Sequence, residues 1–149
     1  MTHVLLALVS GAISGAMLLA LSHLAPTFGA GSMVRDIDRP VLLGRSVTRR
    51  ASHVMGMAVY LALCAVFGAA FAVFVDLGVI SGYGMIPIFA WGAVFACLHG
   101  LIILPLEGHG LFGMKEDAWF PIDLVVMSLL WAVVFWWLMQ LWSGIVSFS

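Results

Sequence analysis

The chain has 149 residues, of which 64% are hydrophobic and 9% charged, and its formal net charge is −1. Soluble domains carry roughly a quarter charged residues, so this composition excludes an ordinary soluble domain and indicates a multi-pass membrane protein, one domain over residues 1–149. No basic stripe is present, so the electrostatic footprint of nucleic-acid binding is missing. The two cysteines, Cys64 and Cys97, lie inside apolar runs and are interpreted as buried thiols rather than a disulfide framework.

Four apolar runs follow one another along the chain, and each is long enough to cross a bilayer, which takes about 20 helical residues. The predicted helices cover about residues 4–24, 52–75, 85–106 and 121–142. Pro26 ends the first run, and Pro121 suits the first turn of the last. Because the second and third loops are short, we expect an all-α, up-down antiparallel four-helix transmembrane bundle.

The positive charges give this bundle an orientation. All 6 lysine and arginine residues lie in the loops 25–51 and 107–120, and the loop 77–83 and both termini have none. Cytoplasmic loops carry an excess of Lys and Arg in membrane proteins. The sequence therefore predicts a protein of the cell inner (plasma) membrane with these two loops in the cytoplasm and both termini outside.

Small residues at intervals of four predict where the helices approach one another closely. Gly11 and Gly15 form such a pair in the first helix, and Gly92, Ala96 and Gly100 form a ridge along the third. Residues without bulk at this spacing let two helix backbones come together in a membrane. We expect helix packing at both places.

The proposed threading brings titratable groups to the cytoplasmic side. The candidate polar or ligand-binding cluster consists of His23, His53, His99, Glu107, His109 and Asp123. His99 lies about two helical turns deeper than the others, roughly 10 Å. An ionisable group inside the bilayer is a functional hypothesis by default. Helix-end polar groups also cap, snorkel or pair with arginines at little cost, so a structural role competes with this hypothesis.

Two kinds of ligand are considered for these residues. A di-metal bundle needs Glu-x-x-His pairs on two helices, and the chain has none, so no metal is predicted. A single helical histidine such as His99 or His53 can hold haem or another pigment, or contact a quinone. No cofactor is therefore predicted, and a haem, pigment or quinone contact is left open.

The fourth helix carries a stripe of bulky side chains, Trp131, Phe135, Leu138 and Trp142, at spacings of four, three and four residues. The other bundle contacts prefer small residues, so we expect this stripe to face lipid or another protein. Interfaces are enriched in Trp and Phe. The stripe is therefore predicted to face a partner, covered in part by another chain or a flat cofactor.

Two classes of function follow. No GxSxG, HExxH, P-loop or Rossmann motif is present, so we expect no enzyme. The favoured role is a non-catalytic accessory or structural subunit of a larger integral membrane complex of the respiratory, photosynthetic or membrane-oxygenase type, in contact with other membrane subunits and lipids. The alternative is a stand-alone membrane protein that binds a lipid, quinone, haem or metal at its cytoplasmic side.

Two segments of the sequence carry short motifs. Gly11 to Gly44 contains Gly-Ala-Ile-Ser-Gly-Ala-Met, Pro26, Asp36-Ile37 and Leu42-Leu43-Gly44, and Leu106 to Trp137 begins Leu-Glu-Gly-His-Gly-Leu-Phe-Gly. Together they resemble a family of uncharacterised small prokaryotic membrane proteins with four transmembrane helices. The resemblance implies the four-helix fold and brings no activity with it. In this chain Glu107 and His109 stand where small residues are ordinary in that family.

The orientation is tested by labelling from outside the cell. A cysteine placed in the loop 77–83 should react with an impermeant thiol reagent on intact cells, because this loop is expected outside. Arg45→Cys should react only after the membrane is permeabilised. Labelling at Arg45→Cys on intact cells would reverse the predicted orientation.

Overall fold

The computed structural model describes residues 2–24, 41–42, 45–46, 49–106, 110–115 and 118–145. Its long helices are α1 (Thr2–Leu24), α2 (Arg49–Asp76), α3 (Met85–Leu98) and α5 (Phe120–Ile145). Shorter elements are a π-helical turn (His99–Ile103), α4 (Leu104–Leu106), a 3₁₀ turn (Leu111–Gly113) and two strands, β1 (Val41–Leu42) and β2 (Arg45–Ser46). The two strands pair antiparallel, with Val41 opposite Ser46.

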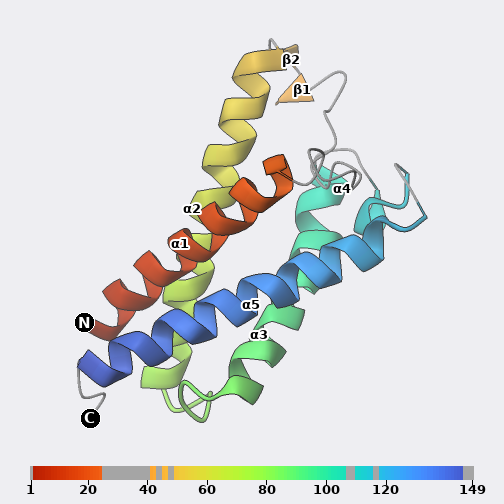
Figure 1. The fold of residues 1–149 in the computed structure, drawn as a ribbon. Coiled ribbons are helices and arrows are strands. Elements are labelled where there is room, and N and C mark those ends of the chain that lie inside the picture. The colour runs from red at the N-terminus through yellow and green to blue at the C-terminus, as the bar shows by residue number, and fades with distance from the viewer. Residues whose placement is uncertain are drawn as a thin grey trace.

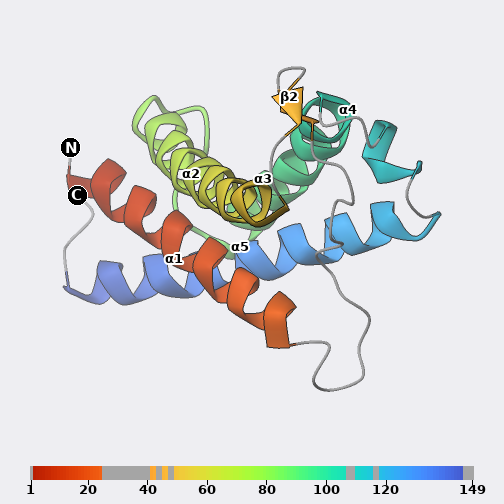
Figure 2. The same ribbon diagram turned by 90° about the horizontal axis from the view of Figure 1, so that it is seen from above.

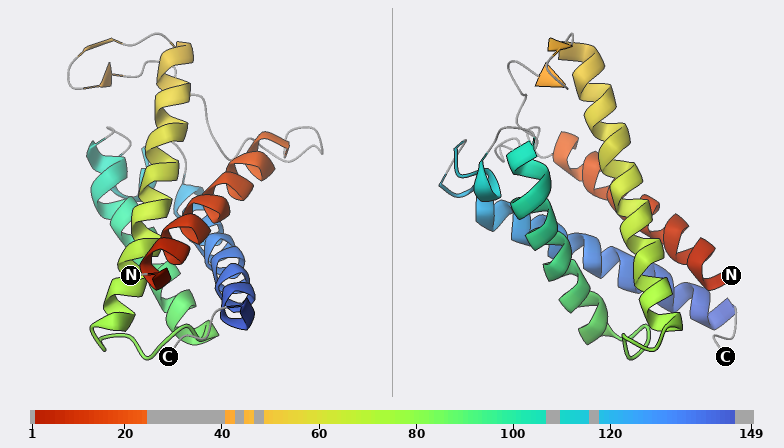
Figure 3. Two further views of the ribbon diagram at one scale, coloured as in Figure 1. Left: turned by 90° about the vertical axis from the view of Figure 1, so that its left-hand side faces the viewer. Right: turned by 180° about the vertical axis from the view of Figure 1, so that it is seen from behind.

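Four helical segments of the described chain are long and apolar enough to span a membrane, namely Thr2–His23, Val54–Asp76, Met85–Leu106 and Phe120–Gly144. Figures 1 and 3 show the start of α1, the end of α2, the start of α3 and the end of α5 toward one end of the molecule. At the other end the helices spread apart, and α2 extends beyond its neighbours. The four predicted helices are thus present, with α2 beginning earlier than expected.

The predicted third helix is not a continuous α-helix. The backbone N–H of Leu104 donates to the carbonyl of His99, five residues back, and this bond marks the π-helical turn that separates α3 from α4. Pro105 gives the physical reason. Proline brings no N–H, and its ring clashes with the carbonyl four residues earlier, so the helix widens just before it.

A glycine closes the end of α2. Gly78 donates to the carbonyl of Val75 at 2.9 Å, and Val79 donates to that of Phe74 at 3.0 Å. This pair of bonds is a Schellman motif, which needs a residue of positive φ between helix and turn. Gly78 has φ 73°. The chain therefore reverses direction within the short connection 77–84 and enters α3.

The helices α1 and α2 lie backbone against backbone. A Cβ placed on Gly11 would collide with the carbonyl oxygen of Cys64, and one on Gly15 would lie 2.9 Å from the Cys64 side chain. On the facing helix, a Cβ on Gly68 would meet the carbonyl of Ala7. The pair Gly11 and Gly15 therefore lies at a helix contact, and Cys64 and Gly68 form the matching small surface of α2. This close approach makes the α1–α2 contact the most extensive one between described elements.

The helices α2 and α3 are separated by aromatic rings instead. The Phe67 ring stacks on Trp91 and on Phe95, with centroid distances of 4.6 and 4.5 Å. The Phe71 ring meets the Trp91 ring edge-on, with 5.9 Å between the two centroids. Since rings fill the space, the backbones of α2 and α3 seldom come within 8 Å of one another.

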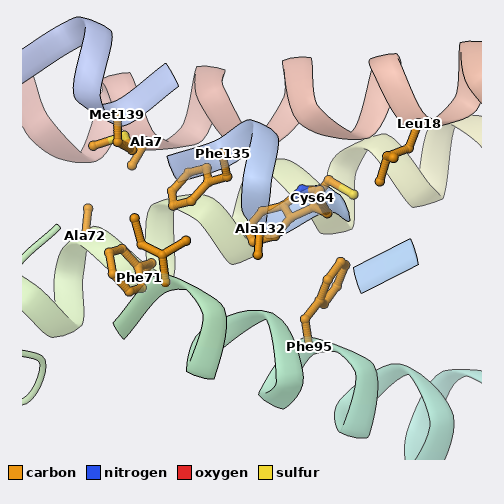
Figure 4. Close-up of a cluster of buried hydrophobic side chains, with 11 residues drawn as sticks. Ala7, Leu18, Cys64, Phe71, Ala72, Phe95, Ala132, Phe135 and Met139 are labelled. Atoms are coloured by element: carbon orange, nitrogen blue, oxygen red, sulfur yellow. The ribbon is translucent and has the colours of Figure 1, made fainter. Parts of the chain in front are cut away.

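The bulky stripe of α5 faces the inside of the molecule, so its predicted partner-facing role is wrong. Trp131 and Phe135 have 0% of their surface exposed, and Leu138 has 8%. Figure 4 shows Phe135 among the buried side chains between the helices. The expectation failed because small residues of one helix leave room for large ones of another. A Cβ on Gly68, for instance, would lie 3.2 Å from the Phe135 ring.

Tryptophan N–H groups fix the helices at defined heights. The indole of Trp131 donates to the carbonyl of Gly11 at 3.3 Å, and that of Trp142 donates to the Ser10 hydroxyl at 3.0 Å, so α5 is tied to α1 twice. Trp91 of α3 donates to the carbonyl of Phe67 in α2 at 3.1 Å. Trp142, the last member of the stripe, therefore also points at α1.

Alanine substitutions at two helical glycines test the α1–α2 contact. Gly11→Ala should lower the melting temperature in detergent, because overpacking costs about 1–3 kcal/mol. Gly56→Ala is the matched control in α2, since a Cβ there meets nothing within 4 Å. It should leave stability unchanged or raise it by up to about 1 kcal/mol through helix propensity. Equal melting temperatures for the two variants would refute the close contact.

Candidate functional site

The turn between α4 and α5 holds several unusual backbone conformations. Gly110, Phe112 and Gly113 have φ of 75°, 51° and 72°. Glycine adopts these values readily, whereas positive φ is strained for a bulky residue. Phe112 is the only described non-glycine residue with positive φ. Such strain persists only where the surroundings hold it in place.

The surroundings of Phe112 are the π-helical turn. A Cβ added to Gly100 would collide with the Phe112 ring, so this ring lies directly on the Gly100 backbone. In the same way, a Cβ on Gly113 would collide with the ring of Phe120 at the start of α5. The Gly-Leu-Phe-Gly turn is thus held between the widened end of the third span and the first turn of α5. The predicted ridge Gly92, Ala96 and Gly100 therefore contacts two different segments, since Gly92 lies against Ala132 of α5.

His99 is the first residue of the π-helical turn and lies inside the span Met85–Leu106. Its imidazole is half-buried and meets the Phe95 ring edge-on at 6.2 Å between centroids. No group in the described part of the chain forms a hydrogen bond with this imidazole. A neutral imidazole has one donor and one acceptor. At membrane depth, unsatisfied groups of this kind cost several kcal/mol.

The backbone beside His99 also departs from helical pairing. The N–H of Leu104 would serve the carbonyl of Gly100 in an α-helix, but it donates to His99. In an α-helix the carbonyl of Leu101 would accept from the N–H of residue 105, but this residue is proline and has no N–H. Single-turn π bulges of this kind are frequent at functional sites. His99 therefore begins a stretch whose backbone departs from α-helical pairing.

The other members of the predicted polar cluster are placed differently. His23 is exposed, and its Nδ1 is 2.8 Å from the carbonyl of Leu19 on its own helix. Asp123 is exposed in the first turn of α5, where the helix dipole favours a carboxylate. Glu107 and His109, and the side chain of His53, lie outside the described residues.

The structure does not bring His23 and His99 together. Figures 2 and 3 show the end of α1, which holds His23, and the α3–α4 segment on opposite sides of the molecule. The cluster was expected because all helix ends on one side were taken to converge, but these ends spread apart. Among the described residues no three His, Cys, Asp or Glu side chains are placed to hold a metal ion.

Polar groups also meet at the opposite end of the molecule. Gln140 of α5 donates to the carbonyl of Tyr83 in the connection 77–84 at 2.9 Å. Burial raises the pKa of the Tyr83 hydroxyl, and the nearby Asp76 carboxylate raises this pKa further. Tyr83 therefore stays protonated at any physiological pH, and its ring meets Phe71 at 5.8 Å. This arrangement joins the end of α5 to the connection 77–84.

Several residues of the site were not singled out from the sequence. Phe112 and the π-helical turn were missed, although Pro105 and the closely spaced glycines Gly108, Gly110 and Gly113 are signals of a disturbed helix end. Gly68 was missed as well, although Cys64, Gly68 and Ala72 have the same spacing of four that identified Gly11 and Gly15. His99 was identified, because a histidine inside an apolar run stands out.

No family model, no curated protein and no solved structure matches this chain. The site is therefore interpreted from its own geometry.

The contact between Gly100 and Phe112 predicts how the Gly-Leu-Phe-Gly turn is held. Gly100→Ala should displace the Phe112 ring and loosen residues 110–115, because the new methyl group occupies the place of the ring. Hydrogen exchange of this segment, followed by mass spectrometry in detergent, should rise several-fold. Gly84→Ala is the control, since a Cβ there makes an ordinary contact of 3.6 Å with Pro87. Unchanged exchange in Gly100→Ala would contradict the contact.

Proposed function

We propose that the chain is a multi-pass protein of the plasma membrane that binds a small molecule of the lipid phase at His99, on its cytoplasmic side. In this proposal the four helices form an up-down antiparallel bundle with both termini outside. The role is binding rather than catalysis, because no catalytic motif occurs in the sequence. The observation that carries the proposal is the His99 imidazole, which lies inside a helical segment apolar enough to span a membrane and has no hydrogen-bond partner among the described residues.

Two further features support a site at this position rather than elsewhere. The π-helical turn begins at His99, and π bulges are frequent at functional sites. The ring of the strained residue Phe112 lies on Gly100, which is the residue after His99 in the chain. Strained conformations also gather where ligands bind. Three departures from regular structure therefore meet where the Phe112 ring lies on Gly100, next to His99.

An accessory subunit of a larger membrane complex is the second candidate. The internal position of the α5 stripe removes the main argument for it, but α2 offers another surface. Its residues Val54, Val59 and Val66 are exposed, and in Figures 1 and 3 the first part of α2 extends beyond the other helices. Native electrophoresis in mild detergent, with mass spectrometry of co-migrating chains, distinguishes the roles: a fixed set of partner chains favours the accessory subunit.

Binding at His99 is tested by what copurifies with the protein. Wild-type protein extracted in native lipid discs should carry a lipophilic molecule at a fixed ratio, measured by mass spectrometry of the organic extract. His99→Phe keeps a flat ring and removes the hydrogen bonds, so occupancy should fall about tenfold, as expected for about 1–2 kcal/mol.

Two variants control this experiment. His23→Phe makes the same change at an exposed histidine whose Nδ1 lies 2.8 Å from the Leu19 carbonyl of its own helix, and it should leave occupancy unchanged. His99→Gln keeps a donor and an acceptor and should retain part of the binding. The proposal is lost if the extracts of wild type and His99→Phe are identical.

A further inference from the structure

The surface around His99 opens toward lipid. Leu98, Leu101 and Ile102 flank it in sequence and are exposed, with 42%, 51% and 49% of their surface accessible. His99 itself lies about two turns, roughly 10 Å, from Leu106 at the end of the span. A molecule that reaches the imidazole therefore approaches through the bilayer and needs an apolar tail.

The depth of His99 also limits the headgroup of this molecule. A phosphate or a carboxylate is charged and favours the bilayer surface rather than a position two turns below it. A neutral imidazole offers one N–H donor and one nitrogen acceptor. A carbonyl accepts from the first, and a hydroxyl donates to the second. A neutral headgroup that can carry either a carbonyl or a hydroxyl therefore suits the imidazole donor in one form and the imidazole acceptor in the other.

Aromatic rings lie near the position. The Phe95 ring meets His99 edge-on, with an angle of 86° between the ring planes, and the same ring lies 5.3 Å from that of Trp131. Phe112 adds a ring against the backbone of Gly100, the residue that follows His99. Aromatic pairs favour stacked or edge-to-face contacts with another flat ring. A saturated or branched headgroup gains nothing from such walls.

We propose that the molecule bound at His99 is a quinone or its quinol: a flat ring that carries carbonyl or hydroxyl groups and an apolar tail. The inference rests on the proposed function and adds the ligand class. The imidazole N–H donates to a quinone carbonyl, or the imidazole nitrogen accepts from a quinol hydroxyl. The Phe95 ring contacts the headgroup, and the Phe112 ring, held over Gly100, limits access from the loop side. The proposal concerns reversible binding and includes no redox step.

The probe is a short-tailed ubiquinone analogue, added to the purified full-length protein in detergent. Quinones quench tryptophan emission at close range, and Trp131 lies next to Phe95. The expected result is saturable quenching, with the apparent Kd raised about tenfold in His99→Phe and unchanged in His23→Phe. Phe112→Leu should weaken binding of the quinone and leave unchanged the binding of an alkyl alcohol with the same tail.

Each outcome has one meaning. Non-saturable quenching, or equal quenching in wild type and His99→Phe, shows partition into detergent and overturns the quinone assignment. Absence of quinone binding, while another lipophile or a haem copurifies in a His99-dependent manner, overturns the assignment and leaves the proposed function standing. Absence of any His99-dependent molecule overturns both. Circular dichroism of each variant excludes misfolding, and His99→Gln, which should bind more tightly than His99→Phe, provides the second test of the hydrogen bond.

Discussion

The direct contact between the backbones of α1 and α2 determines how the rest of the chain packs. Lipid tails are as apolar as leucine side chains, so helices in a membrane associate through close packing rather than through exclusion of water. Gly11, Gly15 and Gly68 permit that packing, because each has the backbone or side chain of the other helix where a Cβ would stand. With α1 held this close to α2, the remaining volume lies on the other side, between α2, α3 and α5.

Aromatic side chains fill this volume, and their N–H groups give the packing a fixed register. Trp91 and Trp131 lie in or beside the core and donate to carbonyls of neighbouring helices. A leucine at either position could fill space but could not bond to another helix. Inside a bilayer a donor without a partner is costly, so each indole favours one height of its helix relative to the next. Trp131 and Phe135 of α5 therefore serve the interior.

The sequence allowed the four helices and two close-packed glycine ridges to be predicted, because length, hydropathy and the spacing of small residues are local properties. The direction of the Trp131 and Phe135 stripe could not be predicted in this way. In a soluble helix the apolar side marks the core, but in a membrane helix both sides are apolar. Only the complementary hollows at Gly11 and Gly68 show which side is inside, and these belong to other helices.

The predicted polar cluster is not formed by its two described histidines, His23 and His99, for a related reason. Its members were placed at similar depth, and depth was taken for proximity, whereas α1 and α3 spread apart at that end. The position of His99 within a span could be predicted, because it depends only on the sequence of its own helix. The structure adds what the sequence left out, namely the widened turn before Pro105 and the ring of Phe112 on Gly100.

In most of the described chain the local conformational preferences agree with the packing of the helices. The segment around His99, Gly100 and Phe112 is the exception. The capped end of α2, the glycine contacts and the bonded indoles each follow ordinary rules of stability. Departures from these rules meet at His99, Gly100 and Phe112: a π-helical turn, a half-buried imidazole without a described partner, and a strained aromatic residue. Natural proteins tolerate such departures chiefly at functional sites. Pro105 explains the turn, and Gly100 explains how the ring fits, but neither explains why a histidine stands between apolar neighbours. The proposed bound partner for the imidazole accounts for the histidine that these two residues leave unexplained.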